Sequence, residues 1–396
     1  MGMKIACTGG GTGGHIFPGI AVLEELKRKR TDLEICWIGS GKQLERGIIS
    51  RFGIPYFAVP SGKLRRYFSL QNFLDVFRLI GGFFSALLLL RRLKVDVLFS
   101  KGGYVSVAPV LAAAALRIPV ITHESDRDPG LATRIIARFA DVVLLPYEQT
   151  RSEHFGGGVD GYRGGVKGNH SNGKGNRGGK QLDGKKSGKR ELIVTGNPVR
   201  REVLQGDAER GRKHLKLGSE RPIVLVLGGS QGARQINQLI ERIREELLKD
   251  AAVVHQMGIL DYKVSHTPGY ITAPIFNAEF PDILAAADLV VSRAGAGTVW
   301  ENGVLGKAAV LIPLGSGSSR GDQMRNAELF VREGAAVALS GEAATPERLL
   351  EHVTDLLRNP EKRRDMGDRA LGICIPDAAE RIADVVLSKS EEGMRS

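Results

Sequence analysis

The stretch TGGGTGGH at residues 8–15 places five glycines between two apolar segments. The preceding residues, Ile5 to Cys7, are typical of the end of a buried strand, and from Phe17 onward apolar residues recur at helical spacing. Glycine allows another group to approach the backbone, and a helix start offers free N–H groups and the positive end of a dipole. The pattern therefore predicts a strand, a glycine turn and a helix, with either a bound anion such as phosphate or only a tight turn. It lacks the GK[ST] of a Walker A loop and fits GxGxxG loosely, so the class of nucleotide stays open.

The second half of the chain repeats this arrangement. LVLGGSQGARQINQLI at 225–240 again indicates a strand, a glycine turn and a helix, and hence a second anion site. Continuous Val, Ile and Leu runs alternate with helical segments in both halves, which is typical of parallel strands covered on both faces. These runs lie at 96–100, 119–124, 141–146, 222–230, 287–295 and 307–315. We therefore expect two doubly wound α/β domains with ligands at the carboxyl ends of the strands.

Length and cysteine content narrow the class of protein. A chain of 396 residues with 42% hydrophobic content is long enough for two or three domains with their own cores. The three cysteines, Cys7, Cys36 and Cys374, are widely spaced and odd in number, which argues against a disulfide framework and a zinc cluster. Because the glycine turn interrupts the N-terminal apolar segment early, we expect no secretory signal. The cysteine usage fits a protein located in the reducing cytoplasm.

The net charge of +12 is concentrated in one segment. Residues 156–190 hold nine Lys or Arg, two Asp and thirteen Gly, with Tyr162 as the one aromatic residue. Such a composition buries too little apolar area to offset chain entropy, so we expect a disordered insertion in the first domain. It would contact anionic lipid or nucleic acid nonspecifically, or have no function. No RNA-binding motif accompanies it, and we expect no specific nucleic-acid partner.

Residues 70–92 predict an apolar helix with basic flanks, KLRR at 63–66 before it and Arg91 and Arg92 at its end. The residues expected near one face are Phe73, Phe77, Ile80, Phe84, Leu87 and Leu88. The unbroken apolar stretch is too short to span a bilayer. The helix therefore belongs to the core of a doubly wound domain or lies on an anionic membrane surface, and both hold if its two faces differ.

Taken together, the motifs resemble the MurG family of UDP-N-acetylglucosamine:lipid I N-acetylglucosaminyltransferases of peptidoglycan synthesis. The motifs that carry the resemblance are TGGGTGGHIFPGIAV from residue 8, SGKLRR (61–66), KGGYVSVAPVLAA (101–113), THESDRDPGLATR (122–134), TGNPVRREV (195–203), VLGGSQGARQIN (226–237) and SRAGAGTVWENGVLGKAAVLIPL (292–314). The resemblance implies a GT-B fold, with two Rossmann-like domains facing a cleft. It places an acceptor and membrane-associated domain at 1–197, a donor domain at 198–375, and a helix at 376–396 that crosses back to the first domain.

The resemblance also implies how UDP-GlcNAc binds. The second glycine turn would hold the diphosphate, with the permanently cationic Arg200 beside it. Glu301 would accept both ribose hydroxyls, and Phe276 would lie at the uracil. The implied donor-binding residues are Thr12, Gly13, Gly14, Asp126, Arg200, Ser230, Gln231, Gly232, Phe276, Glu301, Gln323 and Asn326.

The acceptor, lipid I, would bind at the first glycine turn. The implied acceptor-binding residues are Gly10, Gly11, Thr12, Gly103, Tyr104 and Ser106. Attack by the C4 hydroxyl of N-acetylmuramic acid would invert the anomeric carbon and give a β-1,4 bond. We expect His15 to accept the proton of that hydroxyl, because histidine titrates near the working pH. The alternative is that His15 positions the turn and only hydrogen-bonds the substrate.

Two segments depart from the family pattern. Asp126 stands where the family usually has Asn; it still accepts from a hydroxyl but cannot donate, and its charge is unfavourable beside a diphosphate. Residues 315–328 replace a His- and Asp-bearing loop, although Gln323 and Asn326 still match. The DRD of THESDRDPG only superficially matches a DxD metal motif, so we expect neither a metal nor a cofactor.

The implied partners are UDP-GlcNAc, lipid I, an anionic membrane surface and other cell-wall synthesis proteins, at the cytoplasmic face of the inner membrane. A related GT-B enzyme with another donor sugar or a glycolipid acceptor such as diacylglycerol is the alternative. A nucleotide-dependent dehydrogenase is disfavoured, because IGSGK at 38–42 lacks the acidic residue expected after the second strand.

Overall fold

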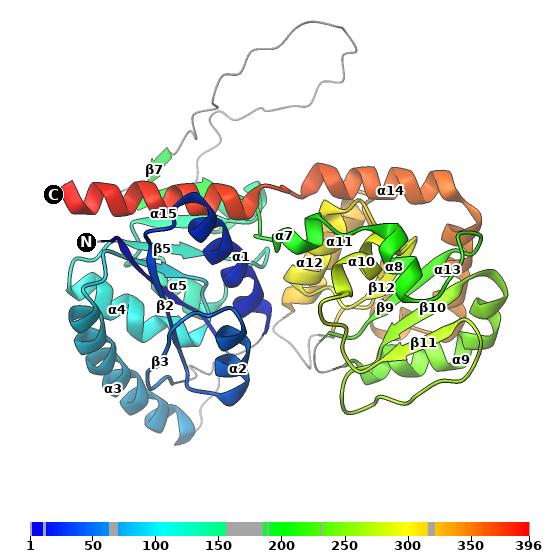
Figure 1. Cartoon of the computed structure of the whole chain (residues 1–396), viewed down its shortest axis with the longest axis horizontal. Helices are drawn as coiled ribbons and strands as arrows, with labels where there is room; N and C mark the ends of the chain where they lie inside the picture. The colour runs from blue at the N-terminus through cyan, green and yellow to red at the C-terminus, as the bar shows by residue number, and fades with distance from the viewer. Residues whose placement is uncertain are drawn as a thin grey trace, which may run out of the picture.

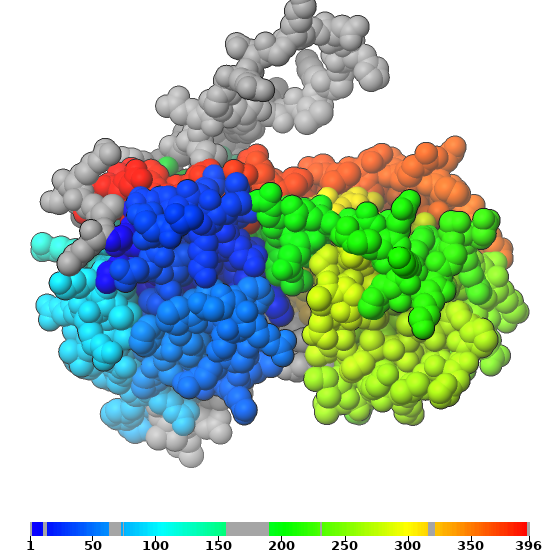
Figure 2. Space-filling model, viewed as in Figure 1, coloured from blue at the N-terminus to red at the C-terminus, as the bar shows by residue number. Residues whose placement is uncertain are grey.

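The computed structural model describes residues 2–10, 13–62, 70–155, 185–187, 190–229, 232–315 and 321–395. They form two α/β units joined side by side, each built around one sheet (Figure 1). The space-filling view shows the two units as separate lobes with a hollow between them (Figure 2). The two doubly wound domains expected from the alternation of strands and helices are confirmed.

The first sheet has eight strands in the order β3-β2-β1-β4-β5-β6-β8-β7. Their bounds are β1 Lys4–Thr8, β2 Glu34–Gly39, β3 Tyr56–Ala58, β4 Val97–Ser100, β5 Val120–His123, β6 Val142–Leu145, β7 Lys185–Ser187 and β8 Arg190–Val194. All neighbours pair in parallel except β7, which is antiparallel to β8. The chain reverses its direction of winding between β1 and β4, and this switch point is where such sheets bind ligands.

Helices cover both faces of this sheet. Their bounds are α1 Gly13–Lys29, α2 Gln43–Arg51, α3 Leu70–Leu93, α4 Val107–Ala115, α5 Leu131–Ile136 and α6 Glu148–His154, with a 3-10 turn η1 at Tyr104–Ser106. One core cluster joins α1 to the sheet through Ile20, Trp37 and Phe99. The other joins α3 and α4 to the opposite face, with Leu90 and Val110 at its centre.

The second sheet has six parallel strands in the order β11-β10-β9-β12-β13-β14. Their bounds are β9 Ile223–Leu227, β10 Ala252–Gln256, β11 Tyr270–Ala273, β12 Leu289–Ser292, β13 Ala308–Leu311 and β14 Val337–Ala338. The helices of this unit are α7 Arg201–Leu204, α8 Ala208–His214, α9 Arg234–Asp250, α10 Phe280–Ala286, α11 Ala296–Val304, α12 Asp322–Arg332, α13 Pro346–Arg358 and α14 Pro360–Ile373. Its switch point lies between β9 and β12, and the second glycine turn begins directly after β9.

The last helix, α15 (Ala378–Arg395), returns to the first unit. Its buried Ile382 and Val386 belong to the core cluster of β1 and α1. Lys29 of α1 pairs with Asp384 at 2.7 Å. Figure 1 shows α14 lying along the second unit and α15 continuing over the first.

The two faces of α3 have different environments. Phe73, Phe77, Ile80, Phe84 and Leu88 are 49–67% exposed, whereas Leu87 packs against the core cluster. The face opposite the exposed residues is buried on the sheet. The core interpretation is therefore confirmed for the buried face, and the exposed apolar face leaves the membrane interpretation as a prediction. Among the described residues, no helix is long and apolar enough to cross a membrane.

The Gly- and Lys-rich insertion expected over 156–190 contains one short strand close to its end. Lys185–Ser187 form β7, which pairs antiparallel with β8, and Arg190 already belongs to β8. Strand pairing uses backbone groups and needs no apolar side chains, so composition alone misses it. The remainder of the segment lies outside the described residues.

Candidate active site

The first glycine turn connects β1 to α1 at the switch point of the first sheet. Gly9 and Gly10 are buried, and the indole N–H of Trp37 donates to the carbonyl of Gly9 at 3.1 Å. A Cβ on Gly10 would lie 2.6 Å from Oε1 of Glu45, a carboxylate that is itself buried. Any larger residue here would displace a carboxylate that also accepts from the N–H of Ser40 and the hydroxyl of Tyr56. Gly11 and Thr12 lie outside the described residues, and Gly13 and Gly14 begin α1.

His15 lies in the first turn of α1, directly against the KGGYVS segment. Gly103 has φ +81°, and a Cβ there would lie 3.1 Å from Cδ2 of His15 and 3.1 Å from the carbonyl of Gly10. The structure thus brings together His15 and the two segments assigned to the acceptor. Tyr104, half-buried, begins η1. Ser106 is fully buried and its hydroxyl donates to Gly102 O at 2.8 Å, so it supports the loop from within.

The segment after β5 is built around the buried carboxylate of Glu124. This carboxylate accepts from the N–H groups of Ser125, Asp126 and Gly130 at 2.7, 3.1 and 3.3 Å. These bonds fix the loop that carries Asp126 to the second unit. Glu124 lies within the motif THESDRDPG, which carries no predicted role for it.

Asp126 and Asn326 join the two units directly. The amide nitrogen of Asn326 donates to Asp126 Oδ1 at 3.0 Å and to Ala294 O at 3.2 Å, while its oxygen accepts from the N–H of Arg127 at 3.1 Å. Asn326 is fully buried. Its amide is therefore engaged between the units in this structure, and its predicted contact with the donor sugar requires these bonds to rearrange. Gln323 accepts from the N–H of Leu314 at 3.0 Å.

An ion-pair cluster lies next to this contact. Carboxylate and imidazole atoms of Asp128, Glu153 and His154 are within 4.8 Å of one another, a spacing that a metal ion would also fit. However, Asp128 pairs with Arg325 at 2.5 Å and Glu153 with Arg127 at 2.9 Å. Because guanidinium groups already balance both carboxylates, the cluster is explained as a link between α12 and the first unit.

The second glycine turn follows β9. Gly232 has φ +80°, and a Cβ there would lie 2.4 Å from the carbonyl of Met257, so only glycine fits. Ser230 and Gln231 lie outside the described residues. Gln256, at the end of β10, donates to Gly229 O at 3.3 Å and accepts from the N–H of Phe276 at 3.0 Å. It thereby ties the turn to the segment predicted at the uracil. Gln256 is not among the residues predicted from the sequence, although a polar residue that ends an apolar strand is a usable signal.

Arg200 and Glu301 are brought together at the boundary between the units. The Arg200 guanidinium lies over the ring of Phe17 at 5.1 Å, and Nη2 is 3.9 Å from Glu301. Its Nε is buried without a hydrogen-bond partner. Burial raises the pKa of Glu301, and Arg200 opposes that shift. A largely buried guanidinium whose ion pairs with Glu202 and Glu301 are 3.6 and 3.9 Å long retains donors for an anionic ligand.

Asn197 is a second polar group that sequence analysis did not single out. It is fully buried, and neither atom of its amide has a hydrogen-bond partner. It lies three residues before Arg200 in TGNPVR, next to the segment that joins the units. Such orphaned amides cost free energy unless a ligand or water completes them, so Asn197 is a candidate contact for a group bound at this segment.

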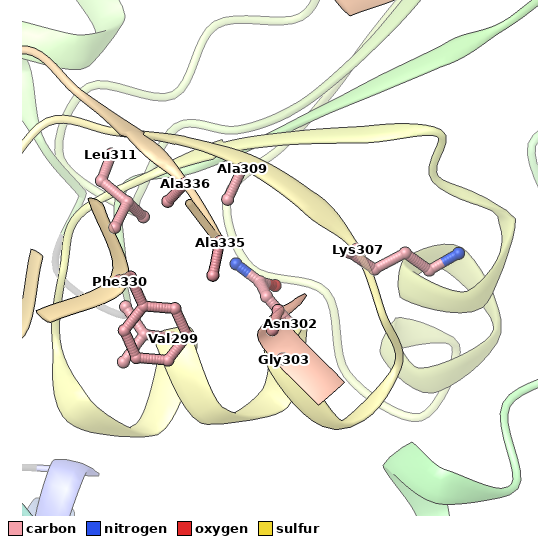
Figure 3. A pocket seen from close by; sticks show the side chains of 10 residues that line it. Val299, Asn302, Gly303, Lys307, Ala309, Leu311, Phe330, Ala335 and Ala336 are labelled. Carbon is pink, nitrogen blue, oxygen red and sulfur yellow. The ribbon is translucent and has the colours of Figure 1, made fainter. Parts of the chain in front are cut away.

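A small enclosed cavity lies on the other side of α11. Asn302 directs its amide into it, opposite Ala309, Ala335 and Phe330 (Figure 3). The space accommodates about one water molecule and does not reach Glu301. It is far too small for a nucleotide sugar and belongs to the interior of the second unit.

Comparison with known proteins relates this geometry to one family. Residues 5–145 match the glycosyltransferase family 28 N-terminal domain, and residues 223–382 match the family 28 C-terminal domain. A protein of Treponema denticola named UDP-N-acetylglucosamine–N-acetylmuramyl-(pentapeptide) pyrophosphoryl-undecaprenol N-acetylglucosamine transferase is 39% identical over 97% of each chain. A Bacillus cereus protein of the same name, with the number 2, is 40% identical over 90% of this chain and 92% of its own.

Solved structures support the fold. The crystal structure of Acinetobacter baumannii MurG matches with a TM-score of 0.70 and 23% identity, over 98% of this chain and 99% of its own. A Neisseria meningitidis UDP-GlcNAc 2-epimerase bound to UDP-GlcNAc matches with a TM-score of 0.65 and 16% identity, over 98% and 100%. The two sheets and the glycine turn in each unit are consistent with the fold of these relatives. The chain therefore belongs to glycosyltransferase family 28, within the MurG group of N-acetylglucosamine transferases.

Proposed function

We propose that the protein transfers GlcNAc from UDP-GlcNAc to the C4 hydroxyl of the N-acetylmuramic acid of lipid I, which gives lipid II. The observation that carries this proposal is full-length similarity to transferases named for that reaction, 39% over 97% of each chain. The duplicated glycine turn at two switch points supports it, because the reaction joins two substrates that each contain a diphosphate.

The donor binds to the second unit, for which we propose the limits 198–375. Backbone N–H groups at the start of α9 and the guanidinium of Arg200 stabilise the negative charge that grows on UDP as it leaves. Ser230, Gln231 and Gly232 surround the diphosphate, and Glu301 accepts from the ribose hydroxyls. Gln323 and Asn326 meet the sugar once the contact between the units rearranges.

The acceptor binds to the first unit, for which we propose the limits 1–197, with the helix at 376–396 returning to it. The first glycine turn holds the diphosphate of lipid I, and the segment from Gly103 to Ser106 frames it. His15 accepts the proton of the C4 hydroxyl as that oxygen attacks the anomeric carbon from the face opposite UDP, so the configuration inverts. The close contact of His15 with Gly103 supports this role.

The exposed face of α3 binds an anionic membrane peripherally, at the cytoplasmic face of the inner membrane. Val76 and the five large apolar residues named above are exposed along it, and Arg78, Arg91 and Arg92 on the same helix are exposed. Apolar and cationic groups on one helix suit the boundary between anionic headgroups and acyl chains. Replacing Phe77 and Phe84 by Ser should reduce cosedimentation with vesicles of phosphatidylglycerol. Replacing Leu371, exposed on α14, should not, and equal losses would refute the assignment.

The transfer itself is tested by incubating purified protein with UDP-GlcNAc and a soluble lipid I analogue. We expect UDP release that depends on the analogue and a disaccharide product of the matching mass. UDP release without the analogue, or only with a different glycolipid or nucleotide sugar, would contradict the proposed substrates.

A further inference from the structure

Lys101 is a cation buried at the switch point of the first sheet. It directly follows β4, its N–H donates to Thr8 O at 2.8 Å, and only 1% of the residue is exposed. Its Nζ lies 2.8 Å from Nδ1 of His123 and also donates to the hydroxyl of Ser125. The proposed reaction assigns Lys101 no role, yet a buried lysine is costly and calls for an explanation.

His123 continues the chain of hydrogen bonds. It is fully buried, and its Nε2 lies 2.8 Å from the carbonyl oxygen of Gly196. A carbonyl only accepts, so Nε2 carries the proton, and Nδ1 accepts from the lysine. Lys101 thereby selects the one neutral tautomer of His123 that bonds to Gly196.

Gly196 lies where the connections between the units converge. It has φ +85°, and a Cβ there would lie 2.9 Å from Cβ of Ile375, 3.1 Å from Cβ of Ala378 and 3.1 Å from the indole of Trp300. Ile375 lies between α14 and α15, and Ala378 begins α15, the helix that returns to the first unit. Trp300 directly precedes Glu301 on α11. The hydrogen-bond chain therefore reaches from the acceptor turn to the segment that places Arg200 and Glu301.

We propose that Lys101 is a positioning residue of the transfer: through His123 it anchors Gly196 and so aligns the donor unit with the acceptor turn. This inference rests on the proposed function. Without Lys101, Nδ1 of His123 loses this donor and the imidazole is free to change tautomer or rotate. The buried Gly196 carbonyl would then keep the hydroxyl of Thr195, at 3.2 Å, but lose the shorter bond from His123. A small misalignment between two reacting groups is expensive, and we expect kcat to fall about tenfold to a hundredfold.

Several charged or titratable groups face this chain. Glu124 and Asp126 follow β5 and favour the charged form of Lys101, as does Cys7 in β1, while burial lowers the pKa of Lys101 to about 8. Burial, the Lys101 cation and, more weakly, His15 hold the pKa of His123 well below its usual range. A neutral amine still donates hydrogen bonds, so the chain persists through neutral and mildly basic pH.

The test is a double-mutant cycle on kcat with saturating UDP-GlcNAc and lipid I analogue. We expect Lys101→Met to lower kcat while KM for either substrate changes less than about threefold. In a His123→Phe background the same substitution should change kcat less than about twofold, because the hydrogen bond from Lys101 to His123 is already absent. Unchanged kcat, or effects of the two substitutions that simply multiply, would overturn the proposal. Lys101→Gln, which retains a donor for Nδ1, should recover part of the loss.

Two readouts separate positioning from simple loss of folding. Lys101→Met should raise the pKa of His123 and move the acid limb of kcat to higher pH, which a purely structural defect would not do. Trp300, whose indole donates to Tyr147 of the first unit at 2.7 Å, reports the alignment of the units without turnover. In a Trp37→Phe background, Lys101→Met should shift the emission of Trp300 to the red. If wild-type protein is inactive, the proposed function fails, and this shift still decides the role of Lys101; an unchanged spectrum would refute it.

Discussion

The two glycine turns share a backbone design but differ in what surrounds them. Each joins a buried strand to a helix at a switch point of its sheet. Around the first turn, the buried polar groups include the charged Glu45, Lys101 and Glu124, which are 1–4% exposed. Beside the second turn, Gln256 is neutral, and burial keeps His255 neutral by lowering its pKa to about 4.

This difference indicates a division of labour. Backbone N–H groups and a helix dipole bind a diphosphate, and at the second turn we propose that the guanidinium of Arg200 adds to them. The first turn lies beside His15 and among buried charged residues, and there we propose that a proton is moved as well as an anion held. Changes at the first turn should therefore reduce turnover, and changes at the second should weaken donor binding.

The largest effect should follow from replacing His15 by Ala. If His15 accepts the proton of the acceptor hydroxyl, kcat should fall by about 10²- to 10⁴-fold with little change in the affinity for UDP. Steady-state kinetics and titration calorimetry measure the two quantities. Near-normal turnover would remove the base role and leave His15 as a residue that only positions the turn.

Gly103→Ala tests the role of the first turn by introducing a methyl group that clashes with it. The new methyl would meet the His15 ring and the Gly10 carbonyl at 3.1 Å, in a backbone conformation that favours glycine. We expect kcat to fall about tenfold to a hundredfold while UDP affinity stays the same. A change in UDP affinity alone would reverse the assignment of the two turns.

Gly232→Ala makes the matching test of the second turn. The methyl would clash with Met257 O at 2.4 Å, so the turn must move, and we expect KM for UDP-GlcNAc to rise about tenfold or more. Gly229→Ala is the control, since its φ is also +80° but no atom lies within 4 Å of the new methyl. Equal effects would show that backbone strain, and not the clash, is responsible.

The buried charge of Lys101 predicts a pH dependence of stability. Its pKa falls from 10.5 in the unfolded chain to about 8 in the fold. Between these values the unfolded chain binds the extra proton, so the free energy of unfolding should rise with pH. From about pH 7.5 to about pH 9.5, wild type should gain roughly 2 kcal/mol relative to Lys101→Met in urea denaturation. A constant difference would contradict burial of the charged amine.

Asp126→Asn should have the smallest effect. The amide oxygen can still accept from Asn326, but the bond loses its charge and Lys101 loses a nearby carboxylate. We expect donor use to weaken about fivefold, or about 1 kcal/mol. Stronger use of UDP-GlcNAc would instead mark Asp126 as a local handicap to donor binding. Competition between UDP-GlcNAc and other UDP-sugars in the transfer assay measures the change.

Local patterns predicted the backbone of the site well. Both glycine turns, the parallel sheets and the two-faced helix α3 follow from residue spacing within short windows. The family resemblance added the roles of residues that no spacing defines, and most of these roles stay predictions.

Contacts between distant segments could not be predicted in this way. Glu45 meets Gly10 only because α2 folds back beside the first turn, and no motif joins them. Asn326 bonds to Asp126 across the two units, 200 positions apart in sequence. The link from Lys101 through His123 to Gly196 likewise depends on the order of strands in the sheet, which composition and periodicity do not determine.

The central claim, that the acceptor binds the first turn and the donor the second, is tested most directly by hydrogen–deuterium exchange. UDP alone should slow exchange at the start of α9 and around Phe276. A soluble lipid I analogue alone should slow exchange at the start of α1 and in the segment 101–107. Protection of the start of α1 by UDP, without protection of α9, would contradict this account.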